Sequence, residues 1–441
     1  MSQTISAPSV LEACGLTSEE IRRIARETGF CKRASGKIDV IDFLHHFCEE
    51  SVKGTVSYND LAAKIQAATG VSASRQAYGE RIHTDVCVAL FQAVLATLML
   101  SKWDAHVLQQ CRLFKRILVQ DSTIIQLPPR LFELFSGVKN AHTTTCNARI
   151  QGVYDLCAGR FIQFSIDPYS KNDVSVAFDL PVEPGDLVLR DRGYFLLEAM
   201  ADFKAQGVET ISRYKHKTAL YDTSTRESLD LLDLLTRSGS VDRIVLAGEN
   251  KDIRLRIVAI PVTEEIANLR RRKAKKEAKG HAPSQELLRL MSWSIFLVTL
   301  ENPALTIHQI MALYGLRWRI ENIFKTWKSN FSFGKVHTVS EQQLRVLLTA
   351  RLIMILVCFH HAYVPLSGEI LRRSHKPLSL MKFMRYLRQN LDQLPRVLLP
   401  RLWNPSLLDA LARYCTYDKR KRQHFITHLD TILEDMAQIP T

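Results

Sequence analysis

The feature that most limits the fold of this chain is a strand–helix–strand pattern in residues 186–214. Residues 186–191 read DLVLRD, an aliphatic run typical of a buried strand. Residues 195–207 have the spacing of a helix that stops at a glycine, and residues 208–214 read as another strand. A strand, a helix and a strand in succession are typical of an α/β or α+β domain, which we therefore predict.

Further strands are expected before this unit. Residues 117–127, ILVQDSTIIQL, are rich in β-branched and aliphatic side chains and predict one strand. Residues 148–166 predict a hairpin that turns at Ala158 and Gly159. We therefore expect residues 111–214 to form the first part of a core built on a mixed sheet.

The next region, residues 215–300, is predicted to be an insertion rich in β-structure. Strand-like segments at 243–248 and 253–260 are separated by a short turn, and another follows at 293–300. Between them, residues 270–280 read RRRKAKKEAKG, a strongly basic run. This run is either a solvated helix or loop, or a segment that contacts phosphates. The basic character of the rest of the chain favours the second interpretation.

The N-terminal region, residues 1–110, is predicted to be helical and to bind DNA. Residues 55–85 have the rhythm of a helix-turn-helix. The second helix of this motif carries Arg75 and Arg81, whose side chains can reach phosphates and base edges. A small packed helical hairpin has the same rhythm, so plain packing is the alternative interpretation.

The charge balance restricts the partners of the chain. The 441 residues include 59 Lys and Arg against 45 Asp and Glu, a formal charge of +14. Such an excess attracts polyanions, and nucleic acid is the most common one inside cells. Nine scattered cysteines without a CxxC pair indicate reduced thiols rather than a zinc or disulfide framework. Since the N-terminus has no signal-peptide pattern, we expect a cytoplasmic protein with no membrane partner.

A helix is predicted from about residue 307 to residue 330, and one polar stripe runs along it. At about 100° per residue, Tyr314, Arg317, Glu321 and Lys328 share a narrow stripe. The side next to it is apolar and is expected to face the core; its residues are Leu316, Ile320, Ile323, Phe324 and Trp327. The stripe is either an ordinary solvated face or a half-buried functional one, in which a carboxylate stays ionised beside basic side chains.

Two aspartates join Glu321 as candidate metal ligands. Asp121 lies inside the predicted strand 117–127, where an unpaired charge is costly. Asp191 ends the strand 186–191, and ligands gather at the C-terminal ends of such strands, although an aspartate in a turn is more often structural. Three carboxylates on a basic chain suggest an oxygen cage for Mg²⁺ or Mn²⁺, in which two ions could act on a phosphodiester.

The polar stripe also resembles a family motif. Its spacing matches the Y-x2-R-x3-E-x6-K motif of the DDE transposases of insertion-sequence family four, in Tyr314, Arg317, Glu321 and Lys328. Residues 120–123 (QDST) and 191–194 (DRGY) resemble the first and second carboxylate motifs of that family. The resemblance covers roughly residues 50–360.

The resemblance implies a ribonuclease H-like core with a β-rich insertion between its fifth strand and the helix of the catalytic glutamate. It implies that Asp121, Asp191 and Glu321 are catalytic residues that hold Mg²⁺ or Mn²⁺, with two ions expected. The glutamate helix would lie in residues 301–340. Residues 341–441 are predicted to form a helical C-terminal region.

The resemblance further implies contacts with DNA. In this family the Tyr, Arg and Lys of the motif contact terminal DNA phosphates, as does a basic residue after the strand that follows DRGY. The corresponding residues here are Tyr314, Arg317, Lys328 and Arg213, with Lys215 nearby. Trp293 is a candidate for a tryptophan that occupies the place of a flipped base, and a core tryptophan on a strand is the alternative.

Several other polar and aromatic residues are given structural interpretations. Trp318 and Trp327 are expected to pack in the core. The adjacent pairs His45-His46 and His360-His361 lack the spacing of helix-borne metal ligands and are expected to be surface or core histidines.

The resemblance thus predicts a DNA transposase that binds terminal inverted repeats, cuts DNA with divalent metal ions and transfers the freed 3′-hydroxyl to target DNA. It also implies a homodimer in the complex that joins two transposon ends. Two alternatives remain: a DNA-binding regulator that no longer catalyses, and a ribonuclease H-like nuclease without strand transfer.

Overall fold

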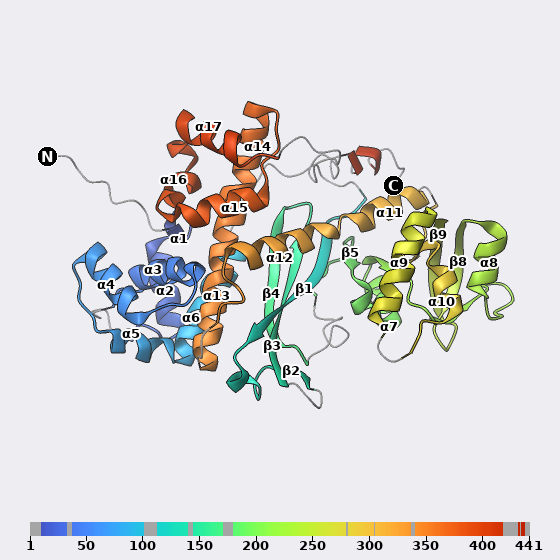
Figure 1. Cartoon of the computed structure of the whole chain (residues 1–441), viewed down its shortest axis with the longest axis horizontal. Coiled ribbons are helices and arrows are strands. Elements are labelled where there is room, and N and C mark those ends of the chain that lie inside the picture. The colour runs from blue at the N-terminus through green and yellow to red at the C-terminus, as the bar shows by residue number, and fades with distance from the viewer. Residues whose placement is uncertain are drawn as a thin grey trace.

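The computed structural model describes residues 10–32, 38–100, 113–139, 144–170, 180–278, 281–303, 305–336, 340–417, 431–432 and 434–436. A basic run in the sequence, KRKR at residues 419–422, lies outside these ranges. Helical regions lie at the left and top of Figure 1, the core strands at the centre, and the insertion at the right.

The centre of the protein is a mixed sheet, which has ten strands within the described residues. Their order is β2-β3-β1-β5-β6-β10-β9-β8-β7, and β4 pairs with β3. The strands are β1 (Ile117–Leu127), β2 (Ser136–Lys139), β3 (Thr144–Asp155), β4 (Arg160–Pro168), β5 (Leu187–Arg190), β6 (Glu209–Arg213), β7 (Leu220–Tyr221), β8 (Val241–Ala247), β9 (Ile253–Pro261) and β10 (Trp293–Val298). β5 runs parallel to both β1 and β6, and the other pairs are antiparallel. The predicted mixed sheet is confirmed.

The strand–helix–strand unit forms as the sequence predicts. Helix α7 (Leu197–Ala205) joins β5 to β6 and ends at Gly207, whose φ of +74° is a conformation that favours glycine. The hairpin of β3 and β4 turns over residues 156–159. The core strands therefore follow one another in space as β4-β3-β1-β5-β6, the arrangement expected for a ribonuclease H-like core.

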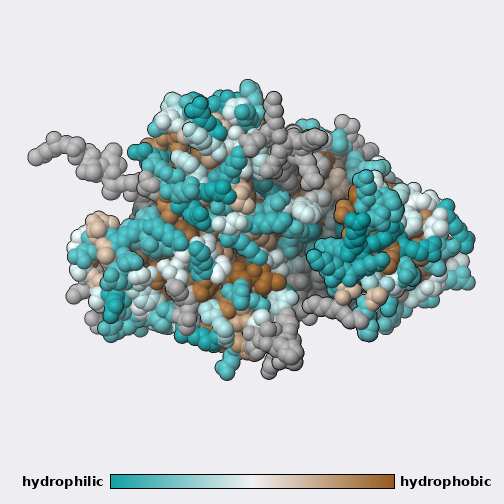
Figure 2. All heavy atoms as spheres, in the orientation of Figure 1, coloured by the Kyte–Doolittle hydropathy of each residue, from teal (hydrophilic) through white to brown (hydrophobic). Residues whose placement is uncertain are grey.

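The insertion continues the core sheet. Its last strand, β10, pairs on one side with β6 of the core and on the other with β9 of the insertion. The predicted hairpin of β8 and β9 is present, and the basic run lies largely in helix α9 (Glu264–Glu277). Hydrophilic side chains cover α9 in Figure 2. The remaining helices of the insertion are α8 (Leu231–Ser238) and α10 (Gln285–Leu290).

A buried arginine ties the insertion to the segment before the glutamate helix. Arg256 on β9 is 4% exposed, and its Nε and Nη2 each lie 2.7 Å from a carboxylate oxygen of Asp242. Its Nη1 and Nη2 also donate to the carbonyls of Asn302 and Leu305, at 2.8 and 2.9 Å. This side chain therefore fixes the backbone just before helix α11 (Ile307–Gly315).

The predicted helix over residues 307–330 is broken in two, which corrects the sequence interpretation. Helix α11 ends at Gly315, and α12 runs from Trp318 to Asn330. Between them the N–H of Leu316 donates to Leu313 and that of Arg317 to Tyr314, at 3.0 and 3.2 Å. These three-residue spacings tighten the turn as in a 3₁₀-helix, so α11 and α12 are separate helices joined at Leu316 and Arg317. The five predicted core-facing side chains are nevertheless all buried.

The predicted helical regions at both ends of the chain are present. The N-terminal helices are α1 (Val10–Ala13), α2 (Ser18–Glu27), α3 (Val40–Lys53), α4 (Tyr58–Thr69), α5 (Arg75–Ile82) and α6 (Asp85–Leu100). The C-terminal helices are α13 (Glu341–Leu356), α14 (Val364–Ser374), α15 (Leu380–Gln389), α16 (Leu394–Leu398) and α17 (Pro405–Tyr414). Figure 1 shows α13 between the N-terminal helices and the core strands.

The C-terminal region contains one long apolar helix. A π-helical segment, Val357–Tyr363, joins α13 to α14, so that Glu341–Ser374 is continuous. By length and composition this helix could cross a membrane, but 94% of its most apolar window is buried inside the protein. It is therefore packed as a core helix.

The core sheet and the helices share one hydrophobic cluster, with Phe161 of β4 near its middle. The Phe161 ring is fully buried, and its centroid lies 4.9 Å from those of Tyr154 and Trp327. The backbone N–H of Phe161 donates to His360 Nε2 at 3.1 Å. Both Trp327 and His360 are buried, as their predicted structural roles require.

We predict that Phe161→Ala lowers the free energy of unfolding by about 3–5 kcal/mol, because it leaves a cavity among aromatic rings. Urea denaturation followed by circular dichroism measures this loss. Leu134→Ala is the control, because the Leu134 side chain is 46% exposed, and it should change stability by less than about 0.5 kcal/mol. Equal losses in the two variants would contradict the proposed core.

Candidate active site

Three carboxylates that are far apart in the sequence meet at one guanidinium. Arg317 Nη1 lies 3.2 Å from Asp121 Oδ2, and Arg317 Nη2 lies 2.5 Å from Glu321 Oε1. The same Nη2 lies 3.9 Å from Asp191 Oδ1. The three residues predicted as metal ligands therefore share one neighbourhood.

The register of the sheet places the two aspartates side by side. Gln120 of β1 pairs with Arg190 of the parallel strand β5, so Asp121 and Asp191 come next on neighbouring strands. Asp191 is extended, and its side chain makes no capping bond to the 3₁₀ turn that follows. Its carboxylate is 53% exposed. Glu321 completes the group from the first turn of α12, which packs against β1.

The electrostatics of the site reflect this crowding of negative charge. The pKa of Asp121 is raised to about 6, mainly by burial and also by the nearby charges of Glu321 and Asp191. The N–H of Ser122, 2.8 Å from Asp121 Oδ1, and the Arg317 guanidinium act in the opposite direction. A carboxylate in such surroundings is stabilised in its charged form by an additional cation.

Tyr314 forms an aromatic layer beside the carboxylates. It is 5% exposed, and its ring centroid lies 4.9 Å from that of Phe296 on β10. The guanidinium carbons of Arg213 and Arg317 lie 5.7 and 5.8 Å from its ring centroid. Tyr314, Arg213 and Arg317 thus form a basic and aromatic wall beside the carboxylates.

This combination of carboxylates and basic side chains agrees with the comparison to known families. Residues 112–357, more than half of the chain, match the family model described as "Transposase DDE domain". The chain belongs to this DDE transposase family. All three carboxylates lie inside the matched segment.

Curated relatives of this DDE transposase come from bacterial insertion sequences. The transposase of element IS231C from Bacillus thuringiensis subsp. berliner is 29% identical over 392 residues, which are 82% of this chain and 80% of the relative. The transposase of IS1151 from Clostridium perfringens is 26% identical over 371 residues, 77% of this chain and 76% of the relative. Among solved structures, a piggyBac transposase synaptic complex with hairpin DNA has a TM-score of 0.45 and 11% identity, covering 96% of this chain and 88% of that chain.

The donor chemistry of the DDE site fits a divalent metal. Its carboxylate oxygens are the hard ligands that Mg²⁺ and Mn²⁺ prefer, and their mutual repulsion is what a cation relieves. Asp121, Asp191 and Glu321 are the residues that would hold such ions. Another group that could hold a metal is His45, His46 and Glu49 on α3, where Lys64 Nζ already lies 2.6 Å from Glu49 Oε2.

The other basic residues predicted to contact DNA are more exposed. Arg213 ends β6 and Lys215 follows it, and both side chains are exposed. Lys328 is exposed on α12, about two turns beyond Glu321, and partial burial of its amine lowers its pKa. Their roles in DNA binding stay predictions.

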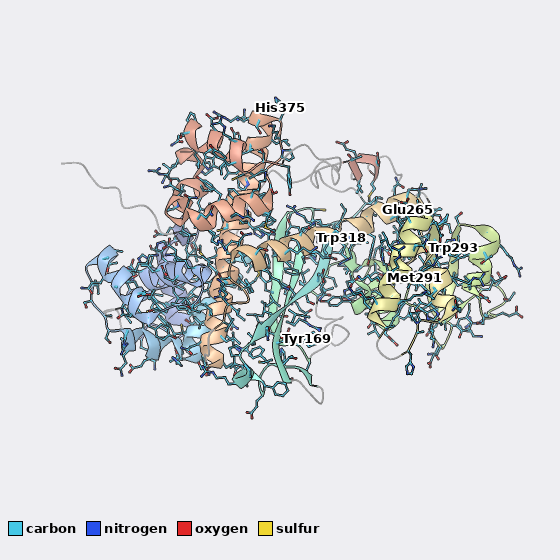
Figure 3. All side chains as sticks on the ribbon, viewed as in Figure 1. Tyr169, Glu265, Met291, Trp293, Trp318 and His375 are labelled. Atoms are coloured by element: carbon cyan, nitrogen blue, oxygen red, sulfur yellow. The ribbon has the colours of Figure 1, made fainter. Side chains whose placement is uncertain are left out.

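The tryptophans differ from expectation in one case. Trp293 packs against the hydrophobic cluster of the insertion, and its Nε1 donates to the Gly239 carbonyl at 2.7 Å. This environment suits a strand tryptophan, and a role at a flipped base stays a prediction. Trp318, expected to pack, is instead 55% exposed at the beginning of α12, with Lys325 Nζ 5.4 Å from its ring centroid. Figure 3 shows Trp318 on α12 and Trp293 in the insertion.

The exposure of Trp318 has a physical reason. The residue immediately follows Arg317 and lies outside the arc of apolar side chains that faces the core. Its place on the helical wheel, beside the polar stripe, was the sequence signal that could have revealed it.

The α4–α5 hairpin forms in the N-terminal region. Ser57 caps α4 by accepting from Asp60 N, and Gly70 ends the helix with a φ of +75°. Arg75 is exposed and lines a surface cavity of about 740 Å³ between the two helices. Arg81 donates to the Phe30 carbonyl at 3.3 Å and lies 5.1 Å from the Phe30 ring centroid. Arg75 is therefore the better placed of the two to reach DNA.

We expect Asp121→Asn to weaken the binding of Mn²⁺ by about tenfold or more, since it removes one charged ligand. Electron paramagnetic resonance of free Mn²⁺, in the absence of DNA, measures the affinity. The exposed Glu265 of α9 provides the control, and Glu265→Gln should leave the affinity unchanged. Equal affinity in the wild type and Asp121→Asn would exclude Asp121 as a ligand.

Proposed function

We propose that this transposase binds the terminal inverted repeats of its element, cuts DNA there with the help of divalent cations, and joins the freed 3′-hydroxyl to target DNA. The observation that carries the proposal is the convergence of Asp121, Asp191 and Glu321 around Arg317. A second support is the basic and aromatic wall next to them, which suits a polyanion.

The residues of the site would have separate roles in phosphodiester cleavage. Bound Mg²⁺ or Mn²⁺, expected as a pair, would lower the pKa of the attacking water or hydroxyl and stabilise the leaving oxygen. Asp121 and Asp191, fixed on neighbouring strands, and Glu321 on α12 would hold these cations in a constant geometry. The reaction we propose is in-line attack on phosphorus without a covalent enzyme intermediate.

The surrounding side chains would orient the DNA strand. Arg317 already neutralises part of the carboxylate charge, and its guanidinium is rigidly placed between two helices. Together with Tyr314, Arg213 and Lys328 it would bind the terminal phosphates, which fixes the scissile bond relative to the carboxylates.

The N-terminal hairpin is proposed to recognise the inverted repeat. Helix α5 begins at Arg75, and the cavity between α4 and α5 is lined by Asn59, Gln76 and other polar side chains that can contact phosphates or bases. With the relatives all from bacterial insertion sequences, we propose a cytoplasmic protein that acts on double-stranded DNA as a homodimer.

Two other functions compete with this proposal. A regulator that only binds DNA has no use for three carboxylates collected around one arginine. A nuclease without strand transfer would use the same carboxylates but would yield nicked DNA alone. The products of the reaction therefore separate these functions.

We predict that Asp191→Asn and Glu321→Gln each reduce cleavage of a duplex carrying the inverted repeat by about a thousandfold or more, since each removes a charged ligand of the cations that would act on the reacting phosphate. Their affinity for the uncut duplex should stay within about threefold of the wild type, because the hairpin is unchanged. Gel analysis of labelled duplex in Mg²⁺ measures cleavage, and fluorescence anisotropy measures binding.

The same gels test the two other functions. Products in which the labelled end is joined to a target plasmid are expected for a transposase. Nicks without joined products would indicate a nuclease, and binding without nicks would indicate a regulator. Full cleavage by either variant would remove that residue from the proposed site.

Arg75→Ala should weaken binding to the inverted-repeat duplex and reduce the slope of log affinity against log salt by about one, as expected for the loss of one phosphate contact. Anisotropy titrations at several salt concentrations measure the slope. Arg237→Ala, on α8 of the insertion, is the control, because Arg237 is exposed and pairs with Asp233 of its own helix at 2.9 Å. An unchanged slope in Arg75→Ala would argue against DNA contact by α5.

A further inference from the structure

A buried arginine of helix α13 holds together two distant parts of the chain. Arg351 is 0% exposed, and its hydrogen bonds run to backbone carbonyls. Nε donates to Ser51 at 2.8 Å, and Nη2 donates to Gly54 at 2.6 Å. Nη2 also donates to Lys335 at 2.9 Å, and Nη1 to Phe333 at 3.4 Å. One guanidinium thus bridges residues near position 50 and residues near position 335.

These carbonyls lie at the ends of two helices. Ser51 and Gly54 belong to the C-terminal end of α3, which ends at Lys53. Phe333 and Lys335 belong to the turn that follows α12, which ends at Asn330. Carbonyls at the C-terminal end of a helix lack intrahelical partners and carry partial negative charge, so a cation there is stabilising. Arg351 therefore caps the end of α3 and, with the same charge, bonds to the turn that follows α12.

The turn after α12 depends on such a partner. Ser332 in this turn has a φ of +51°, a left-handed conformation that is unfavourable for a non-glycine residue. The Ser332 side chain is also buried. The hydrogen bonds of Arg351 to Phe333 and Lys335 hold the backbone directly behind this strained position, and so fix how α12 ends.

The other end of the bridge leads into the hairpin proposed to bind DNA. Gly54 lies three residues before Ser57, the cap of α4. The first turn of α13 also contacts this hairpin, because Gln343 bonds to the Tyr58 hydroxyl and Ser340 Oγ lies 3.3 Å from His83 Nδ1. Helix α13 is therefore attached both to the hairpin and to the end of the helix that carries Glu321.

An apolar side chain could fill the same volume without the cost of burying a charge. Burial lowers the pKa of Arg351 to about 10, so the guanidinium still carries its charge at neutral pH. A planar group with five N–H donors is able to bond to carbonyls of two separate segments, whereas an ammonium presents its donors at a single point. The site therefore uses the specific shape of arginine.

We propose that Arg351 is a positioning residue that couples DNA binding by the α4–α5 hairpin to the placement of Glu321 on α12. The proposal rests on the proposed function, since it assumes that the hairpin binds the inverted repeat. In this arrangement, DNA bound at the hairpin sets the position of α3 and α4. The hydrogen bonds of Arg351 then set the position of the C-terminal end of α12 relative to them.

The test compares two duplexes and the variant Arg351→Lys. One duplex carries the whole inverted repeat, and the other carries the cleavage site without the internal repeat. On the whole repeat, Arg351→Lys should cut about tenfold more slowly than the wild type, while its affinity stays within about threefold. On the short duplex, both proteins should cut at the same low rate, because the hairpin is not engaged.

Arg345→Lys is the control, because Arg345 lies on the same helix and pairs with Glu341 of that helix at 2.8 Å. It should behave as the wild type on both duplexes. If Arg351→Lys slows cleavage of both duplexes equally, Arg351 has a merely structural role and the coupling is refuted. No slowing on either duplex also refutes it.

A second measurement uses the wild type alone and does not depend on the folding of a variant. Hydrogen exchange is followed with a duplex that carries only the internal part of the repeat. Amides of residues 331–336 should exchange more slowly on binding, together with those of the hairpin. Protection of the hairpin with unchanged exchange at 331–336 would overturn the coupling. A wild type that binds this duplex but cuts neither cleavage substrate overturns the proposed chemistry instead, and hydrogen exchange still decides the coupling.

Discussion

The ion-pair centre at Arg317 is the interaction on which the rest of the site depends. Two unit charges about 4 Å apart interact by about 4 kcal/mol at an effective dielectric constant of about 20, so three close carboxylates need a positive partner. Arg317, in the turn between α11 and α12, supplies this positive charge. The parallel strands β1 and β5 fix Asp121 and Asp191 beside each other. The carboxylates are thus brought together by the fold itself, before any DNA is bound.

Helices α11 and α12, which carry this centre, are held at both ends by buried arginines. Arg256 of the insertion bonds to the carbonyls of Asn302 and Leu305 before α11. Arg351 bonds to the carbonyls that follow α12. At these two places both arginines bond to backbone carbonyls, so they fix the path of the chain. The position of Glu321 therefore depends on contacts at both ends of its segment.

The sequence predicted those features that depend on local patterns. The bounds of β1 agree with the aliphatic run at 117–127, and the hairpins follow from turn residues between such runs. The three carboxylates could be identified because each lies in a short motif that is readable in the sequence, although the motifs are far apart along the chain. Their closeness in space follows from the parallel register of β1 and β5, which local patterns do not encode.

Other features lay beyond the reach of sequence patterns. A continuous helix and two helices joined by a tight turn have the same apolar spacing around Gly315. The break is therefore seen only in the structure, from the three-residue hydrogen bonds of that turn. Trp318 was expected to pack because it lies on the helix of Glu321, yet it is 55% exposed. Arg351 stands in the apolar run RLIMILV, and its partners are main-chain carbonyls, which leave no trace in the identity of the residues that provide them.

The continuity of the sheet from β6 through β10 into β9 has a mechanical consequence. The insertion cannot swing about a flexible tether, because a change in its orientation must bend or shear the ladder of hydrogen bonds that leads through β6 to β5. A force on α9 would therefore strain β5, the strand that ends next to Asp191.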